Sequence, residues 1–315
     1  GFLESLIGEV GGVSLRQLHF EAAAVARGYA SLRPLAERMG VTPPAPRLAG
    51  FAYAHLAALG AEVVFPENSE PRAFPLLRAP ADIDALREPQ DYLAAPVIRR
   101  KLEALEELRT RCPDAVNTIG HLFEGPVTTA VLLMGPDFLM LPYDEPGRAH
   151  GLLAFVVDSA VHYARAVQER LGLSSGPGPV WIPDDFAGLF PPELFAEFVV
   201  PYWERLYAGL QATERYLHAE LLRVEHLPWL KHLRVNVFDP ATDPYLSSAK
   251  LAEHCPCRFT AHIHAWEIRD CSAEQLQRLY TEHVRHGPAN IAFVMERLAE
   301  EPKIRALLEV ARRFA

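Results

Sequence analysis

The chain has 315 residues, of which 50% are hydrophobic and 23% charged, and its formal net charge at pH 7 is −9. This balance is typical of a soluble globular protein with a large core. The basic residues are scattered, which argues against a nucleic-acid partner, whereas a small anionic substrate stays compatible because the local field in a cleft outweighs net charge.

The sequence predicts neither a membrane span nor a secretory signal. No apolar run reaches the roughly 20 residues that cross a bilayer. The four cysteines are too few for a disulfide scaffold, so we expect the protein in the reducing cytoplasm. Position 1 is glycine rather than methionine, and we therefore expect the chain to begin inside a longer one.

Residues 1–110 are predicted to be mostly helical. Apolar residues recur at three- and four-residue spacing in three segments, which proline-rich connectors separate. The expected helices are Ser14–Arg38, Ala49–Leu59 and Asp91–Thr110. The short run 63–65 is the only strand candidate in this part.

From residue 111 the pattern changes to repeated strand–helix units within a single predicted domain, 1–315. The expected strands are 115–119, 179–183, 215–219, 233–238, 258–264 and 290–295. The expected helices are 147–171, 191–212 with a bend at Pro201, 227–232, 245–254, 272–285 and 303–314.

Repeated strand–helix units imply parallel strands joined by right-handed crossovers. Counting the run at 63–65 gives seven strand candidates, one short of a (β/α)8 barrel. The alternative is a doubly wound open sheet, which usually carries a glycine-rich phosphate turn, and no G-x-G-x-x-G occurs here. We therefore predict an α/β fold of the (β/α)8 TIM-barrel type with an N-terminal helical extension.

In such a barrel the residues that follow each strand surround one mouth, where the active site lies. By this rule, several carboxylates and three histidines are predicted to lie at the mouth. The candidates are Glu124, Asp184, Asp185, His218, Glu220, Asp239, His262, His264 and Glu296.

The pair His218 and Glu220 is the strongest of these features. Residues two apart on an extended segment share a face, so both side chains point the same way. A surface pair on an edge strand is the plainer interpretation, and we weigh a role in the site at about two to one against it.

The other candidates have plainer interpretations as well. One of Asp184 and Asp185 is expected to cap a turn while the other faces the mouth. His264 is expected in the site, and His262 is equally compatible with a structural role. His121 and Phe123 fit either core or mouth, and Cys255-Pro-Cys257 precedes its strand and is expected to be structural.

Histidine and carboxylate ligands suit zinc, which would lower the pKa of a bound thiol or water. Without a metal, the same groups could hold an anionic substrate and act as general acid and base. The residues alone leave both alternatives open.

Two segments resemble the uroporphyrinogen decarboxylase and corrinoid-methyltransferase superfamily. One is Gly120-His-Leu-Phe-Glu-Gly-Pro-Val-Thr-Thr-Ala130, and the other runs from Ile182 through Asp184-Asp185 and Pro191-Pro-Glu-Leu-Phe195 to Pro201. His218-Ala-Glu220 falls where the methyltransferases carry the His-x-Cys of their zinc site. The resemblance covers about residues 50–314.

The resemblance implies a (β/α)8 barrel and either of two chemistries. In the methyltransferase branch, zinc activates a thiol that exchanges a methyl group with a corrinoid on a partner protein. The decarboxylase branch removes carboxyl groups from a tetrapyrrole without a cofactor, using an arginine-rich N-terminal motif and an aspartate. Here the arginine-rich motif is absent, Glu220 replaces the expected cysteine, and Glu296 lies close to where a third ligand, also a cysteine, would be.

We therefore expect a metal-dependent methyltransferase-like enzyme, with a small-molecule substrate and a corrinoid protein as candidate partner. The predicted metal ligands, for zinc or another divalent metal, are His218, Glu220, His264 and Glu296. The predicted catalytic residues are Asp184, Asp185 and His264, and the predicted cofactor-binding residues are Phe123, Glu124 and Asp239. The alternatives are a metal-free decarboxylase or lyase, and a non-catalytic corrinoid- or tetrapyrrole-binding protein.

Overall fold

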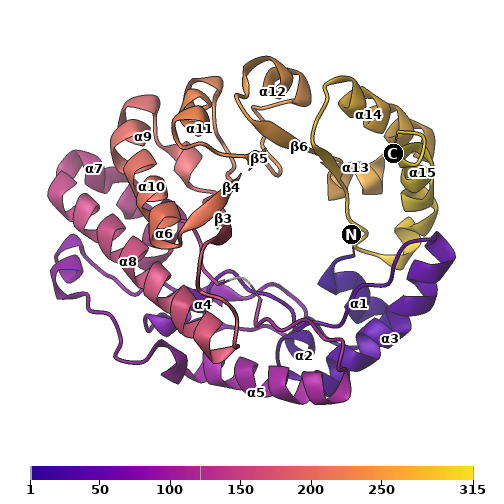
Figure 1. Cartoon of the computed structure of the whole chain (residues 1–315), viewed down its shortest axis with the longest axis horizontal. Helices are drawn as coiled ribbons and strands as arrows, with labels where there is room; N and C mark the ends of the chain where they lie inside the picture. Colours follow the sequence, from indigo (N-terminus) through magenta and orange to yellow (C-terminus); the bar gives the residue numbers. More distant parts are fainter. Residues whose placement is uncertain (1, 121, 315) are drawn as a thin grey trace.

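The computed structural model describes residues 2–120 and 122–314, so Gly1, His121 and Ala315 lie outside the description. Helices surround a parallel sheet in an open ring (Figure 1). The α-helices are α1 Glu4–Gly11, α2 Leu15–Phe20, α3 Ala22–Met39, α4 Ala54–Ala58, α5 Pro96–Arg111, α6 Pro126–Met134, α7 Leu141–Asp144, α8 Pro146–Arg170, α9 Pro192–Phe198, α10 Val200–Gly209, α11 Pro228–His232, α12 Ser248–His254, α13 Ala265–Asp270, α14 Ala273–Arg285 and α15 Glu301–Ala311.

Short 3₁₀ helices connect several of these elements. They are η1 Pro80–Ala85, η2 Tyr92–Ala94, η3 Pro136–Met140, η4 Ala187–Leu189, η5 Val224–His226 and η6 Leu298–Glu300. No helix in the described ranges is both long and apolar enough to cross a membrane.

The central element is a five-stranded parallel sheet. Its strands are β3 Gly178–Pro183, β4 Ala212–His218, β5 Val237–Asp239, β6 Arg258–His262 and β7 Asn290–Ala292. They lie in chain order, with each strand paired to the next, as right-handed crossover units produce. The fold is therefore mixed α/β with a parallel sheet.

Two of the predicted strands are not part of this sheet: the strand at 63–65 is confirmed but lies in another sheet, and the strand at 115–119 is not formed. β1 Val63–Val64 pairs antiparallel with β2 Arg72–Ala73 in a separate small sheet, and no sequence pattern indicated β2. The predicted strand 115–119 forms no strand, although the amide of Val116 donates to the carbonyl of Pro46 at 2.9 Å. Extended backbone registers as a strand only where a neighbouring strand pairs with it.

The helical predictions are closer to the structure, because amphipathic periodicity is a local property. The expected helix 14–38 is divided at Glu21 into α2 and α3, and α2 begins with a capping box formed by Ser14 and Gln17. The helix expected at 191–212 is also divided, at Val199. Pro201 then occupies the first turn of α10, where a missing amide hydrogen costs no hydrogen bond.

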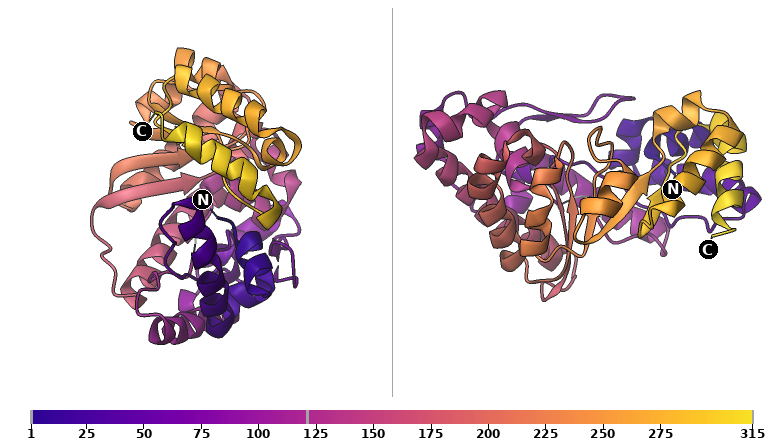
Figure 2. Two further views of the ribbon diagram at one scale, coloured as in Figure 1. Left: turned by 90° about the vertical axis from the view of Figure 1, so that its right-hand side faces the viewer. Right: turned by 90° about the horizontal axis from the view of Figure 1, so that it is seen from above.

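The two ends of the described chain meet. Phe2 forms a parallel bridge with Met295, just beyond β7, and the amide of Leu3 donates to the carbonyl of Met295 at 3.1 Å. Arg38 of α3 pairs with Glu301 of α15 at 2.8 Å. The N-terminal and C-terminal helices accordingly lie side by side (Figure 2).

The core consists of two hydrophobic clusters. One lies between the sheet, at β3–β6, and the helices α6–α12, and the other joins α1–α5 to the segment from β6 to α15. Tyr53, Leu59 and Leu122 pack against both clusters. The prediction of a single domain stays a prediction.

Candidate functional site

The carboxyl ends of β3, β4, β5 and β6 bring four ionisable side chains together. They are Asp185, His218, Asp239 and His262, named the His–Asp cluster below. His218 Nε2 lies 3.3 Å from Asp185 Oδ1, and His218 Nδ1 lies 3.5 Å from Asp239 Oδ2. His262 Nε2 contacts the other oxygen of Asp239 at 2.6 Å. The four side chains thus form an unbroken series of polar contacts across the ends of four strands.

Strand alternation explains how His218 reaches this position. On β4, Arg215 and Leu217 are buried on the helix-facing side, whereas Tyr216 and His218 project from the other face. Burial lowers the pKa of His218, but the hydrogen bond with Asp239 and the charges of Asp185 and Asp239 outweigh burial and raise the pKa above its ordinary value. The imidazole is therefore stabilised in its protonated form.

Asp239 is the opposite case. The carboxylate is buried, which alone would raise its pKa, yet hydrogen bonds from His218, His262 and the amide of Ala241 hold the pKa well below its usual range. Asp239 is therefore ionised, and it orients both imidazoles.

Two carboxyl oxygens in this region have no hydrogen-bond partner among residues 2–120 and 122–314. They are Oε2 of Glu124 and Oδ1 of Asp185, and both are buried; the second has only its ion-pair contact with His218. Burial, and then the charges of Asp185 and Asp184, raise the pKa of Glu124 well above its ordinary value. Burial also raises the pKa of Asp185, although His218 opposes the change. Unpartnered buried polar atoms are rare in folded proteins, so Oε2 of Glu124, which has neither a hydrogen bond nor an ion pair among the described residues, is a candidate contact for a ligand group.

Asp184, predicted as catalytic, instead fastens one helix to the sheet. Its side chain is completely buried, Oδ1 accepts from the amide of Thr128 at 2.7 Å, and Oδ2 accepts from the amide of Val127 at 3.2 Å. Trp203 Nε1 donates to the same Oδ2 at 2.6 Å. Asp184 thus caps the amino end of α6, and any side chain at Gly125 would collide with it. Every hydrogen-bonding contact of this side chain is internal.

Three of the four predicted metal ligands, Glu220, His264 and Glu296, each contact a different part of the chain. Glu220 accepts a hydrogen bond from Thr242 Oγ1 at 2.6 Å. His264 precedes α13, where its ring stacks on Trp266 with the two centroids 4.1 Å apart, and burial lowers its pKa. Glu296 lies beside the chain's first helix, since its carbonyl accepts from Ser5 Oγ at 3.1 Å.

These residues do not fit a zinc ion. No three His, Cys, Asp or Glu side chains in the described part of the chain form a group that could hold a metal. Both ring nitrogens of His218 contact carboxylates, Asp185 Oδ1 at 3.3 Å and Asp239 Oδ2 at 3.5 Å, and neither carboxylate is among the predicted ligands. The predicted ligand set is therefore not assembled in this structure.

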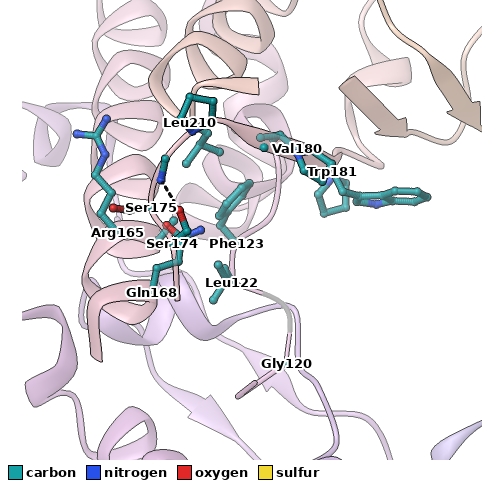
Figure 3. A pocket seen from close by; sticks show the side chains of 16 residues that line it. Gly120, Leu122, Phe123, Arg165, Gln168, Ser174, Ser175, Val180, Trp181 and Leu210 are labelled. Atoms are coloured by element: carbon teal, nitrogen blue, oxygen red, sulfur yellow. Dashed lines mark hydrogen bonds between the residues drawn. The ribbon is translucent and has the colours of Figure 1, made fainter. Parts of the chain in front are cut away.

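A cavity of about 600 Å³ is lined by Gly120, Leu122 and Phe123 together with residues of α8 and β3. Its walls include Phe123, Leu122 and Leu210, with Arg165 and Gln168 at one side (Figure 3). The indole of Trp181 extends away from these side chains in Figure 3, and its centroid lies 6.2 Å from that of the His218 ring. Phe123 thus lines the cavity, whereas Asp239 is part of the His–Asp cluster and Glu124 lies close enough to Asp185 for their charges to interact.

Sequence reasoning left the role of His262 open and did not indicate Tyr53. The sequence favoured His264 over His262, but His262 ends β6 and bonds directly to Asp239. The spacing of His262 and His264 predicted that both lie on the same face of their strand. It did not indicate which of the two would lie opposite Asp239. Tyr53 carried no signal, and its pKa is raised by burial and by the charges of Glu124, Glu70 and Asp185.

The chain is similar in sequence to proteins of one family. The family described as uroporphyrinogen decarboxylase (URO-D) matches residues 51–255. The uroporphyrinogen decarboxylase of Trichormus variabilis is 26% identical over 165 residues, which are 50% of this chain and 45% of that protein. The enzyme of the same name from Aromatoleum aromaticum is 29% identical over 161 residues, 49% of this chain and 42% of that protein. The matched regions thus span less than half the length of these relatives.

A solved structure, a methyltransferase from Methanosarcina mazei, is similar over 98% of this chain and 90% of its own, with a TM-score of 0.71 and 18% identity. At this identity the likeness concerns the fold alone. The resemblance inferred from the motifs at 120–130 and 182–201 is confirmed, since the family match includes both. The chain belongs to the uroporphyrinogen decarboxylase (URO-D) family.

Proposed function

We propose that this protein is a metal-independent acid–base enzyme that decarboxylates a small carboxylic acid bearing N–H groups. The observation that carries the proposal is the His–Asp cluster, in which the pKa of His218 is raised and that of Asp239 lowered at ion-pair distance. Titratable neighbours whose pKa values are pushed apart are typical of acid–base sites. Membership of a family named for a decarboxylase supports the same reaction type.

In the proposed reaction the substrate's carbon–carboxyl bond breaks, carbon dioxide leaves, and the electron pair stays on carbon. His218 donates its Nε2 proton to that carbon, and Asp239 stabilises the imidazolium beforehand through Nδ1. Water then returns a proton to His218, so one proton is consumed for each carbon dioxide released. This step requires a protonated donor, and the raised pKa of His218 favours the protonated imidazole relative to an ordinary histidine.

The unpartnered Oε2 of Glu124 would accept an N–H group of the substrate, and Asp185, paired with His218 through Oδ1, would accept a second one. A partner for Glu124 Oε2 would remove the penalty of leaving this buried acceptor unsatisfied, which is about 1–3 kcal/mol. Trp181 would support the apolar body of the substrate, since this residue is 42% exposed, lines the cavity and has its ring centroid 6.2 Å from that of His218. These contacts favour a planar, N–H-bearing acid over a simple aliphatic one.

We also propose that the five-stranded sheet is part of a (β/α)8 barrel. The likeness to the Methanosarcina mazei structure supports it, as do main-chain contacts beyond both edges of the sheet. The amide of Gly125 donates to the carbonyl of Pro183 at the end of β3, and Phe2 bridges to Met295, which follows β7. A cytoplasmic location is part of the same proposal, supported by four cysteines that are all free thiols.

Carbon dioxide release tests the reaction. Uroporphyrinogen and smaller N-heteroaromatic acids would be offered to the wild type and to His218→Gln and Glu124→Gln. Loss of a general acid should lower kcat/KM by about 10²- to 10⁴-fold, with no effect of a chelator on the wild type. His254→Gln is the matched control, because this histidine lies at the end of α12 outside the cluster. Full turnover by His218→Gln, or activity that zinc restores after chelation, would refute the mechanism.

Methyl transfer to or from a corrinoid on a partner protein is the second candidate. It is favoured by one observation, the likeness of nearly the whole chain to a protein named as a methyltransferase. The zinc-dependent form of this chemistry needs a ligand set that residues 2–120 and 122–314 do not gather. Following the visible spectrum of methylcobalamin with a panel of thiols tests it, since demethylation in the presence of the enzyme would favour this candidate over decarboxylation.

A further inference from the structure

Cys255 and Cys257 form a pair of neighbouring thiols that the proposed reaction does not use. Their sulfur atoms lie 3.7 Å apart, at hydrogen-bond distance for thiols, and both residues are partly exposed. Cys255 caps the carboxyl end of α12, where its amide donates to the carbonyl of Leu251 at 2.8 Å. A bend at 256–257 then leads directly into β6, so the bend holds the two side chains on the same side.

The pair lies at the amino end of β6, whereas His262 of the His–Asp cluster ends the same strand. The sulfurs are therefore separated from the cluster by the length of β6. Both cysteines also pack against the hydrophobic core beside β5, which limits how far either side chain moves. The other two cysteines, Cys112 and Cys271, have no second cysteine close to them in the sequence.

We propose that Cys255 and Cys257 are a thiol–disulfide exchange site that low-molecular-weight disulfides oxidise to an intramolecular disulfide. Closing the pair requires the sulfurs to approach from 3.7 Å to the bond length of about 2.05 Å, a movement that side-chain rotation and a small backbone shift supply. No third ligand joins the pair in the described part of the chain, so a structural metal does not compete for the two sulfurs.

The two thiols differ in a way that assigns their roles. The hydrogen bond shared by the two sulfurs lowers the pKa of Cys255 despite burial, and the same bond, with burial, raises the pKa of Cys257. Cys255 is therefore the more readily ionised and the attacking group, because the thiolate is the nucleophile in exchange. Cys257 is the resolving group.

The exchange proceeds in two balanced steps. The Cys255 thiolate attacks one sulfur of the external disulfide, which forms a mixed disulfide and releases one thiol. Cys257, as its thiolate, then attacks the Cys255 sulfur, which forms the internal disulfide and releases the second thiol. Two protein thiols are oxidised, one external disulfide is reduced, and the two thiol protons end on the two released thiols.

The test equilibrates the full chain anaerobically in oxidised and reduced glutathione, blocks free thiols with N-ethylmaleimide, and locates the blocked sites by peptide mass mapping. Oxidation should remove two of the four alkylation sites together, at Cys255 and Cys257, and dithiothreitol should restore both. Cys257→Ser should instead accumulate a stable glutathione adduct on Cys255, because nothing resolves it.

Cys112→Ser and Cys271→Ser are matched controls that should still lose two sites. Retention of all four sites in excess oxidised glutathione would refute the proposal. A stable glutathione adduct in the wild type, or oxidation that maps to other cysteines, would refute it equally. Because the wild-type measurement needs no substitution, it decides the proposal even where a variant misfolds.

Discussion

Replacing Asp184 tests whether this buried carboxylate holds α6 to the sheet. In Asp184→Ala, the amides of Val127 and Thr128 and the indole N–H of Trp203 lose their acceptor inside the core. Each buried donor left without a partner costs about 1–3 kcal/mol, so we expect a loss of about 3–5 kcal/mol, allowing for partial rearrangement. This is a large part of the roughly 5–15 kcal/mol that stabilises a typical domain.

The assay is urea-induced equilibrium unfolding at pH 7.5, followed by circular dichroism. Asp184→Asn keeps one acceptor oxygen and should lose less, about 1–2 kcal/mol, which provides a measurable variant if the alanine protein does not fold. Asp185→Asn is the control, because the side chain of Asp185 is partly exposed and its replacement should change stability by under about 1 kcal/mol. A loss below about 1 kcal/mol in Asp184→Ala would refute the anchoring role.

The same residue predicts a pH dependence. Burial raises the pKa of Asp184 from 3.8 to about 6, despite the opposing hydrogen bonds from Trp203 and Thr128. A raised pKa means that the folded state binds the proton more tightly, so this contribution to stability is full below about pH 4 and is lost as the pH rises through about 6. At 1.36 kcal/mol per pH unit the difference is roughly 3 kcal/mol. Asp184→Asn should lack this component, which unfolding at pH 5 and pH 7.5 would reveal.

Two further predictions concern other buried charges. Asp239→Asn should lower the pKa of His218, because the hydrogen bond with Asp239 is the leading cause that raises this pKa. NMR titration of the imidazole measures the change. An unchanged pKa would contradict the assigned contact. Burial lowers the pKa of Lys101 from 10.5 to about 7, so the folded state binds this proton less tightly and stability should rise with pH between about 7 and 10.5. Lys101→Met should lack that rise in unfolding experiments at pH 7 and pH 9, and an equal rise in both proteins would show that other groups cause it.

Local patterns in the sequence predicted most of the fold. The periodicity of 147–171 corresponds to α8, and the alternation around 215–219 corresponds to β4 with His218 on the inner face. The prediction of a strand at 115–119 was wrong, because extended backbone becomes a strand only when a neighbouring strand pairs with it, whatever its composition. No local signal indicates whether a neighbouring strand approaches.

The site was harder to predict, since its chemistry depends on contacts between strands. Sequence spacing placed His218 and Glu220 on one face, but the partner of each comes from elsewhere: Asp239 for the histidine and Thr242 for the glutamate. The spacing of Asp184 and Asp185 could not show that the first would cap a helix beginning nearly sixty residues earlier. The role of each of these side chains therefore depends on which residues from other parts of the chain lie next to it in the fold.

The bridge between Phe2 and Met295 has a consequence for the order in which the protein is made. During synthesis, the first strand-like contact of the chain must wait until nearly three hundred further residues have been added. Until then, α1 and α3 lack the surface of η6 and α15 against which they pack, and part of their apolar side remains exposed. We expect nascent chains that stop before α15 to depend on chaperones, and a shortened chain ending near residue 295 to aggregate where the intact chain remains dispersed.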